Sequence, residues 1–84
     1  MTAYVLIQTR SDSKPLGEPL RAMRGVVSAD VLTGPYDAIA VASADSSRDL
    51  FGRILPQIRE LPGVTQALPA PLVRERDRGD EEAA

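Results

Sequence analysis

The residues that offer the most chemistry in this 84-residue sequence lie in one short segment, Thr33 to Asp37. Gly34 permits backbone conformations that other residues avoid, Tyr36 carries a ring and a hydroxyl, and Asp37 carries a carboxylate. A carboxylate beside the backbone N–H groups of a turn can hold a small zwitterion, with the acid binding the ammonium group. Pro35 removes one of those donors. Because these are also ordinary turn residues, residue chemistry alone favours a plain hairpin turn.

Composition excludes several other kinds of site. The chain has no cysteine and no histidine, so Ser-His and Cys-His nucleophile pairs are ruled out, and no zinc, iron or copper site and no cofactor is expected. The net charge is −2 and the sequence pI is about 5.0, which argues against direct binding of nucleic acid. No apolar run has the length of a membrane span, and Arg10 and Asp12 stand where a signal peptide has its apolar core. We therefore expect a cytoplasmic protein with no membrane partner.

The elements that must position the segment can be read from the spacing of apolar residues. Helical spacing predicts a first helix that begins at Pro15 or Leu16 and ends at Met23, and a second helix over 46–61. A Gly-Pro pair predicts a hairpin turn before the third strand. Short apolar, β-favouring runs predict four strands, over 3–9, 26–33, 36–43 and 64–73.

The second predicted helix has a clear start and an internal conflict. Ser46 with Asp49 three residues later resembles a capping box. Pro56 lacks the N–H that would bond the carbonyl oxygen of Gly52, so a kink or an irregular turn is expected there. The buried face of this helix is predicted to carry six large apolar residues, Leu50, Phe51, Ile54, Leu55, Ile58 and Leu61.

The C-terminal part of the sequence sets the domain boundary. Pro69 and Pro71 interrupt the last predicted strand, and because proline cannot donate to a sheet ladder, this strand should be short and lie at an edge. Residues 74–84 are charged and have no apolar anchor, so a disordered tail is predicted. One domain is therefore expected, over 1–73.

A faint internal repeat indicates the topology. Residues 20–26 (LRAMRGV) run parallel to residues 58–64 (IRELPGV), and Leu16 likewise matches Ile54. The same helix-to-strand unit thus appears twice. Two interleaved strand–helix–strand units predict an α+β, ferredoxin-like βαββαβ sandwich, with four antiparallel strands and both helices on one face.

Two helices can cover only one face of such a sheet. Yet the first strand is apolar on both faces, with Tyr4 and Leu6 on one and Val5 and Ile7 on the other. An antiparallel sheet with one face in water should alternate more clearly. We therefore expect a second copy to cover the open face, giving a dimeric α+β barrel, with a monomer that exposes an apolar sheet as the alternative.

Three segments of the sequence resemble one known family. Residues 33–37 (TGPYD), followed by an apolar strand, are similar to the Gly-x-Tyr-Asp signature of the Lrp/AsnC ligand-binding domain, also called the RAM domain. The junctions at 24–27 (RGVV) and 61–64 (LPGV), at the starts of the second and fourth strands, are similar to the same domain. The resemblance extends over nearly all of the predicted domain.

The resemblance implies both an assembly and a site. It implies a fold that dimerises through its sheet, and dimers that assemble further into octamer-like rings. It also implies that an amino acid or a related metabolite binds at contacts between dimers. By this match the ligand-binding residues are Gly34, Tyr36 and Asp37, with Pro35 at the variable position. No catalytic residue and no metal ligand is expected.

The sequence departs from the family in three respects. Full-length members carry an N-terminal helix-turn-helix domain, whereas this chain begins at its first strand, so it resembles a stand-alone form. Ala67 and Pro69 occupy the last strand, where members often carry threonines. Pro56 is atypical of the second helix.

The function that follows from the resemblance is regulation rather than catalysis. The chain is expected to be an effector-binding module that modulates transcription through a partner, such as a full-length Lrp/AsnC paralogue. Two alternatives stay open. One is a small dimeric α+β barrel enzyme, for which the available acid–base groups are few. The other is a ligand-free partner that co-assembles with full-length regulators.

Overall fold

The computed structural model of the chain describes residues 1–72. The tail predicted over 74–84 and the last residue of the strand predicted over 64–73 lie outside the described residues. The described elements are β1 (Thr2–Thr9), α1 (Gly17–Arg21), β2 (Val26–Val31), β3 (Ala38–Ser43), α2 (Ser47–Asp49), the π-helical turn η1 (Leu50–Ile54), α3 (Leu55–Arg59) and β4 (Val64–Pro71).

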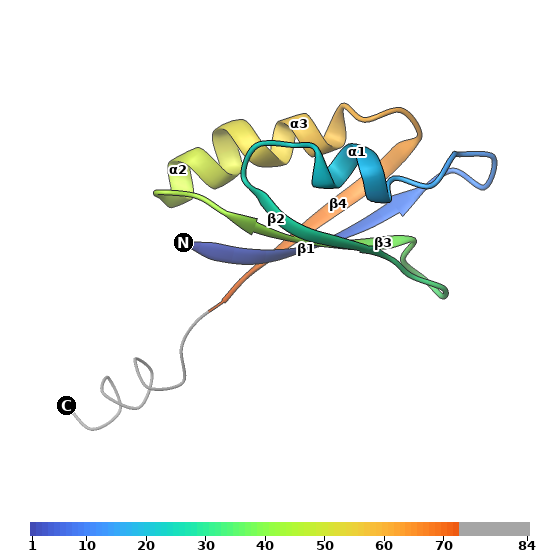
Figure 1. Ribbon diagram of the computed structural model, residues 1–84, viewed down its shortest axis with the longest axis horizontal. Helices are drawn as coiled ribbons and strands as arrows, with labels where there is room; N and C mark the ends of the chain where they lie inside the picture. Colours follow the sequence, from blue (N-terminus) through green and yellow to red (C-terminus); the bar gives the residue numbers. More distant parts are fainter. Residues whose placement is uncertain (73–84) are drawn as a thin grey trace, which may run out of the picture.

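The four strands form one antiparallel sheet in the order β2-β3-β1-β4. β1 and β3 are the central strands, so the two strand–helix–strand units interleave. The helical segments all lie on one face of the sheet (Figure 1). The α+β, ferredoxin-like βαββαβ fold predicted from the sequence is therefore confirmed.

The core lies between the sheet and the helical segments, and alanine dominates its sheet side. In β3, Ala38, Ala40 and Ala42 are at most 2% exposed, and in β1, Val5 and Ile7 are fully buried. Small side chains on the sheet let the helical segments lie close to it. The remaining volume is filled by side chains that the sequence pattern placed in the core, Leu16, Leu20, Leu50, Ile54, Leu55 and Ile58.

The second predicted helix is present but is built in three parts. It starts as predicted, because the Ser46 hydroxyl accepts a hydrogen bond from the Asp49 N–H at 3.1 Å. The irregularity predicted for Pro56 takes the form of η1, in which the Leu55 N–H donates to the carbonyl oxygen of Leu50. Pro56 then falls in the first turn of α3, where its missing N–H and its ring are tolerated.

Two details of the helices differ from the prediction. Phe51 was expected on the buried face but is 45% exposed, because Leu50 and Ile54 take the positions that face the sheet. α1 is also shorter than predicted, since it begins at Gly17, which keeps Pro19 in the first turn. The predicted last residue, Met23, follows α1 in a tighter turn.

The loop between β2 and β3 is longer than the predicted hairpin turn. β2 ends at Val31 and β3 begins at Ala38, so each strand stops two residues short of its predicted bound. The Leu32 N–H donates to the carbonyl oxygen of Asp37 at 2.8 Å and closes the loop.

β4 lies at an edge of the sheet, as predicted, but it is not short. It spans eight residues, the same length as β1. The Leu72 N–H donates to the carbonyl oxygen of Thr2 at 2.9 Å, so the even-numbered residues of this stretch face β1. Pro69 and Pro71 therefore occupy positions that face away from β1, where a missing N–H costs the ladder nothing.

The face of the sheet away from the helices, here called the open face, carries large apolar side chains. Tyr4 of β1 lies opposite Val41 of β3. Leu6 of β1 lies opposite Ile39 of β3 on one side and Leu68 of β4 on the other. Tyr4 is 41% exposed and the other four are half-buried. The apolar character of both faces of the first strand is thus confirmed, and no element in residues 1–72 covers the open face (Figure 1).

Candidate functional site

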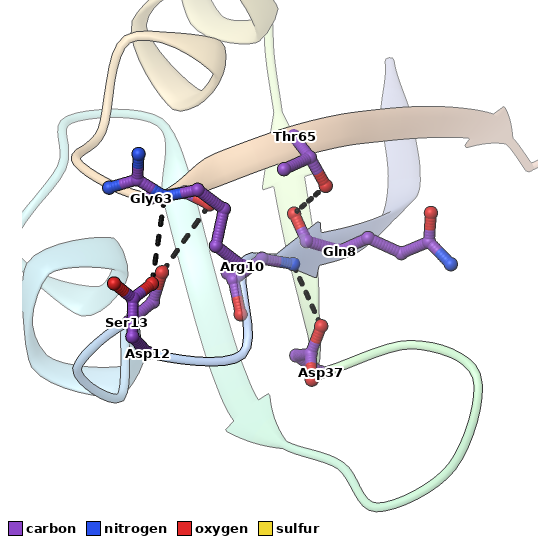
Figure 2. Close-up of polar contacts among 8 residues, drawn as sticks. Gln8, Arg10, Asp12, Ser13, Asp37, Gly63 and Thr65 are labelled. Atoms are coloured by element: carbon purple, nitrogen blue, oxygen red, sulfur yellow. Dashed lines mark hydrogen bonds and ion pairs between the residues drawn. The ribbon is translucent and has the colours of Figure 1, made fainter.

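Asp37 is tied to β1 by both its backbone and its side chain. Its N–H donates to the carbonyl oxygen of Ile7 at 2.8 Å. Its carboxylate oxygen Oδ2 accepts a hydrogen bond from the backbone N–H of Thr9 at 2.7 Å (Figure 2). Together with the contact to Leu32 that closes the loop, these bonds place the carboxylate where β1 ends. The acid is therefore a structural anchor as well as a candidate ligand group.

The rest of the predicted ligand segment forms the tip of the loop. Gly34 has a φ of +127°, and nothing lies within 4 Å of the position that a Cβ would take, so glycine serves the backbone conformation and not a close contact. The carbonyl oxygen of Pro35 accepts a hydrogen bond from the Gln8 side chain at 2.8 Å. Tyr36 is half-buried. The β1 strand thus holds the loop at several points.

A cavity of about 160 Å³ lies beside Asp37, on the helix-facing side of the hairpin's base. Its walls are mostly apolar, and its polar groups come from the end of β1, from the loop after it and from Asp37. This volume is below that of most drug-sized ligand sites and suits a small metabolite. The lining residues are Thr9, Ser13, Lys14, Pro15, Leu16, Val31, Leu32, Asp37 and Ala38.

Of the four predicted site residues, only Asp37 lines this cavity. Gly34, Pro35 and Tyr36 shape the loop that carries it. Lys14 brings a positive charge to the same cavity and was missed, because residues 10–14 look like an ordinary polar turn in the sequence. Nothing in the local pattern there indicates that the turn folds toward the hairpin.

The loop that carries Lys14 is held in place by the junction between α3 and β4. The Arg10 N–H donates to the carbonyl oxygen of Gly63 at 2.9 Å, and the Ser13 N–H donates to that of Arg10 at 3.0 Å. Gly63 has a φ of +89°, and a Cβ on it would collide with the Ser13 hydroxyl. Only glycine therefore allows this approach. The second of the two repeated Gly-Val junctions thus positions the cavity.

The strongest charge pair of the described residues lies elsewhere, on the second helical segment. Arg53 donates to both carboxylate oxygens of Asp49, at 2.7 and 2.9 Å. This side-chain hydrogen bonding, in which Arg53 donates and Asp49 accepts, lowers the pKa of Asp49 and raises the pKa of Arg53. Neither residue lines the cavity, so this pair supports the helix and not the site.

Residues 1–72 contain neither a metal-binding cluster nor a membrane-spanning helix. No group of three or more histidine, cysteine, aspartate or glutamate residues in this part of the chain could hold a metal ion. No helix there is long and apolar enough to cross a membrane.

Comparison with known proteins gives a match in structure. No protein-family model matches the chain, and no protein of curated function matches it. The crystal structure of FFRP-DM1 is 30% identical with a TM-score of 0.76, and the match covers 86% of this chain and 97% of that one. TTHA0845 from Thermus thermophilus is 31% identical with a TM-score of 0.70, and the match covers 89% of this chain and 98% of that one.

A third similar structure is that of a transcriptional regulator with a bound ligand. It is the transcriptional regulator NMB0573 from Neisseria meningitidis in complex with L-Met. It is 19% identical with a TM-score of 0.75, and the match covers 88% of this chain and 50% of the regulator. At that identity the match shows the fold alone.

Fold and comparisons together define the class. FFRP-DM1 is of the Lrp/AsnC family, and the regulator is of the same type. The chain therefore belongs to the Lrp/AsnC-like class, as an α+β domain of ferredoxin-like fold. Its match with FFRP-DM1 runs through nearly the whole of that protein, so the likeness is one of entire domains.

Proposed function

We propose that this chain is a ligand-binding (RAM-type) module that takes up an amino acid or a related metabolite and responds by changing its assembly. The effector would bind in and around the cavity beside Asp37, with Gly34, Pro35 and Tyr36 shaping the loop. The output would be modulation of transcription through a partner, such as a full-length Lrp/AsnC paralogue that carries a DNA-binding domain.

The observation that carries the proposal is the pairing of opposite charges in one small cavity. Asp37 and Lys14 both line it, and Pro15, Leu16 and Val31 supply apolar wall between them and the core. An α-amino acid has a matching set of groups: an ammonium for Asp37, a carboxylate for Lys14 and a side chain for the apolar wall. The L-Met complex of the regulator from Neisseria meningitidis is a case of this ligand class on the same fold.

The open face supplies the assembly. Tyr4, Leu6, Ile39, Val41 and Leu68 form a continuous apolar surface there, and its burial against a second copy would stabilise a dimer. Higher oligomers would then form by contacts between dimers. An effector that binds the assembled form better than the separate dimers shifts the equilibrium toward assembly, because binding and association are linked.

The test is a titration of the full chain with single amino acids, L-methionine first, followed by thermal melting and by sedimentation. At a ligand concentration of 100 times the Kd, binding adds about 2.7 kcal/mol to the free energy of unfolding, which raises the Tm by several degrees. Asp37→Asn should abolish this rise. Asp12→Asn, which removes the same charge at a highly exposed position outside the cavity, should keep it.

Two results would contradict the proposal. One is an unchanged Tm and an unchanged mass with every amino acid at concentrations on the order of 10 mM. That result would favour the ligand-free co-assembly partner. The other is an equal response in wild type and Asp37→Asn, which would place any effector away from this cavity.

A further inference from the structure

β2 and β4 are the two edge strands of the sheet, and each presents backbone groups that no other strand takes up. In β4, the hydrogen bond from the Leu72 N–H to the carbonyl oxygen of Thr2 shows that the even-numbered residues direct their backbone polar groups toward β1. The backbone groups of Ala67, Pro69 and Pro71 therefore point away from the sheet. Exposed edges of this kind are templates on which another chain can add a strand.

The outward residues of β2 follow from the same reasoning. The Ser43 N–H donates to the carbonyl oxygen of Gly25, so the odd-numbered residues of β3 face β2. Their partners in β2 are even-numbered, with Val41 opposite Ser28. The backbone N–H and carbonyl of Ala29 therefore point outward from the edge of the sheet.

On each edge, one outward carbonyl oxygen is occupied by an arginine. Arg21 donates from Nη1 to the carbonyl oxygen of Ala29 at 2.8 Å, and Arg59 donates from Nη2 to that of Ala67 at 3.1 Å. In both cases the arginine precedes the alanine by eight residues. The two arginines occupy equivalent positions of the internal repeat, so each half of the molecule ties its last helical turn to its own edge strand.

Each edge carries a second feature that opposes strand addition. On β4, Pro69 and Pro71 remove two of the outward N–H donors. On β2, the pairing with β3 is irregular between Val26 and Ser28, and such bulges disrupt an edge. Gly17 also leaves space for the Arg21 guanidinium, since a Cβ there would lie 3.0 Å from Nη2.

We propose that Arg21, Arg59, Pro69 and Pro71 close both edges of the sheet against strand addition, so that a second copy of this chain pairs with it through the open face and not edge to edge. Two edges brought together would also bring like-charged guanidinium groups together, which opposes the contact further. This closure does not depend on the effector, so its test is independent of the proposed function.

The structure also defines the stretch where a strand could still add. A shallow groove of about 280 Å³ runs beside the first half of β4, lined by Arg59 and by residues 64–68. Along β4 this groove is followed by Pro69 and Pro71, so a strand that pairs there would find few consecutive backbone N–H donors. Opening this edge therefore requires both the arginine and the prolines to be changed.

The test compares Arg59→Met combined with Pro69→Thr and Pro71→Thr against Arg24→Met, whose arginine is exposed and makes no side-chain hydrogen bond within residues 1–72. We expect the triple variant to grow in mass with concentration, to at least twice the wild-type assembly. We also expect hydrogen exchange of the outward N–H of Ala67 to slow by about tenfold or more. The control should keep the wild-type mass and exchange.

The exchange measurement separates edge pairing from loss of structure, because pairing protects the outward N–H whereas unfolding exposes it. A folded triple variant with wild-type mass and fast exchange at Ala67 would overturn the proposal. If the triple variant does not fold, Arg21→Met is tested at the β2 edge. β2 contains no proline and its irregular pairing is confined to 26–28, so Arg21 alone closes the edge at Ala29. There, growth in mass with slower exchange at Ala29 supports edge closure, and wild-type behaviour contradicts it.

Discussion

At the scale of single residues, Asp37 connects the local structure to the proposed site. Its carboxylate accepts the Thr9 N–H at 2.7 Å and at the same time lines the cavity that Lys14 reaches. One carboxylate oxygen thus anchors the loop to β1, and the negative charge is the group proposed to bind the ligand. The two roles can be separated by substitution.

Asp37→Asn should keep the hydrogen bond from Thr9 and lose the charge, whereas Asp37→Ala should lose both. We expect the alanine variant to lose about 1–3 kcal/mol of unfolding free energy, because a half-buried N–H is left unpaired. The asparagine variant should stay within about 1 kcal/mol of wild type. Urea denaturation measures both, and equal losses in the two variants would contradict the anchoring role.

Gly63 is the second residue on which the site depends. Gly63→Ala should destabilise the fold by about 2–5 kcal/mol, since the strain of a positive φ adds to a collision with Ser13. Gly34→Ala is the matched control, because it meets no atom within 4 Å and carries backbone strain alone. Replacing Ser13 by glycine in the Gly63→Ala background should recover the part due to the collision. A double-mutant cycle without such recovery would show that the collision is relieved in another way.

At the scale of elements, the helical segment from Ser47 to Arg59 shows how a proline is accommodated. The wide turn η1 ends at Ile54, two residues before Pro56, and lets the helical path continue to Arg59. Gly52 lies in this turn, exposed, with nothing within 4 Å of a Cβ position. No steric contact requires glycine at this position, and the conformational freedom of its backbone weakens the helix.

Gly52→Ala should therefore stabilise the protein by about 0.5–1 kcal/mol, mainly by restricting the unfolded chain. Gly17→Ala is the comparison on α1, where the added methyl would lie 3.0 Å from Nη2 of Arg21 and displace the guanidinium from Ala29, so it should raise the Tm less. Thermal melting of both variants measures the difference. A lower Tm for Gly52→Ala would mean that the wide turn needs glycine.

Patterns of a few residues predicted the elements, and the errors lie where tertiary contacts decide. The Ser46 cap and the core positions of the second helix follow from local spacing and are found in the structure. Phe51 was assigned to the core wrongly, because Leu50 and Ile54 are the residues of η1 that face the sheet. β4 was expected to be short because it contains two prolines. The sequence does not show whether the nitrogen of a proline points toward the neighbouring strand or away from it.

The site could be predicted only in part, for a similar reason. The loop from Gly34 to Asp37 stands out in the sequence because it resembles the Gly-x-Tyr-Asp signature, although its residues are also ordinary turn residues. Lys14 does not, because its place in the cavity depends on the contact between residues 10–13 and Gly63, far away in the chain. The repeated Gly-Val junction was visible as a pattern, but its role in positioning the loop was not.

At the scale of the whole molecule, the sheet has one apolar face that no element of residues 1–72 covers, and an arginine at each of its two edges. This combination favours face-to-face association. Leu6→Glu should place a charge at the centre of the open face and weaken self-association by at least about tenfold, or roughly 1.4 kcal/mol. Ser47→Glu, at the exposed start of α2, is the control for the added charge and should leave the mass unchanged. Sedimentation equilibrium distinguishes the two, and an unaltered mass for Leu6→Glu would exclude the open face as the interface.

The most direct test of the central claim is an amide nuclear magnetic resonance titration of the full chain with L-methionine and the other amino acids. We predict saturable shifts for at least one amino acid, gathered on the N–H groups of Thr9, Ser13, Lys14 and Asp37, and their loss in Asp37→Asn. Absence of saturable shifts with every amino acid, or shifts gathered away from this cavity, would contradict the account.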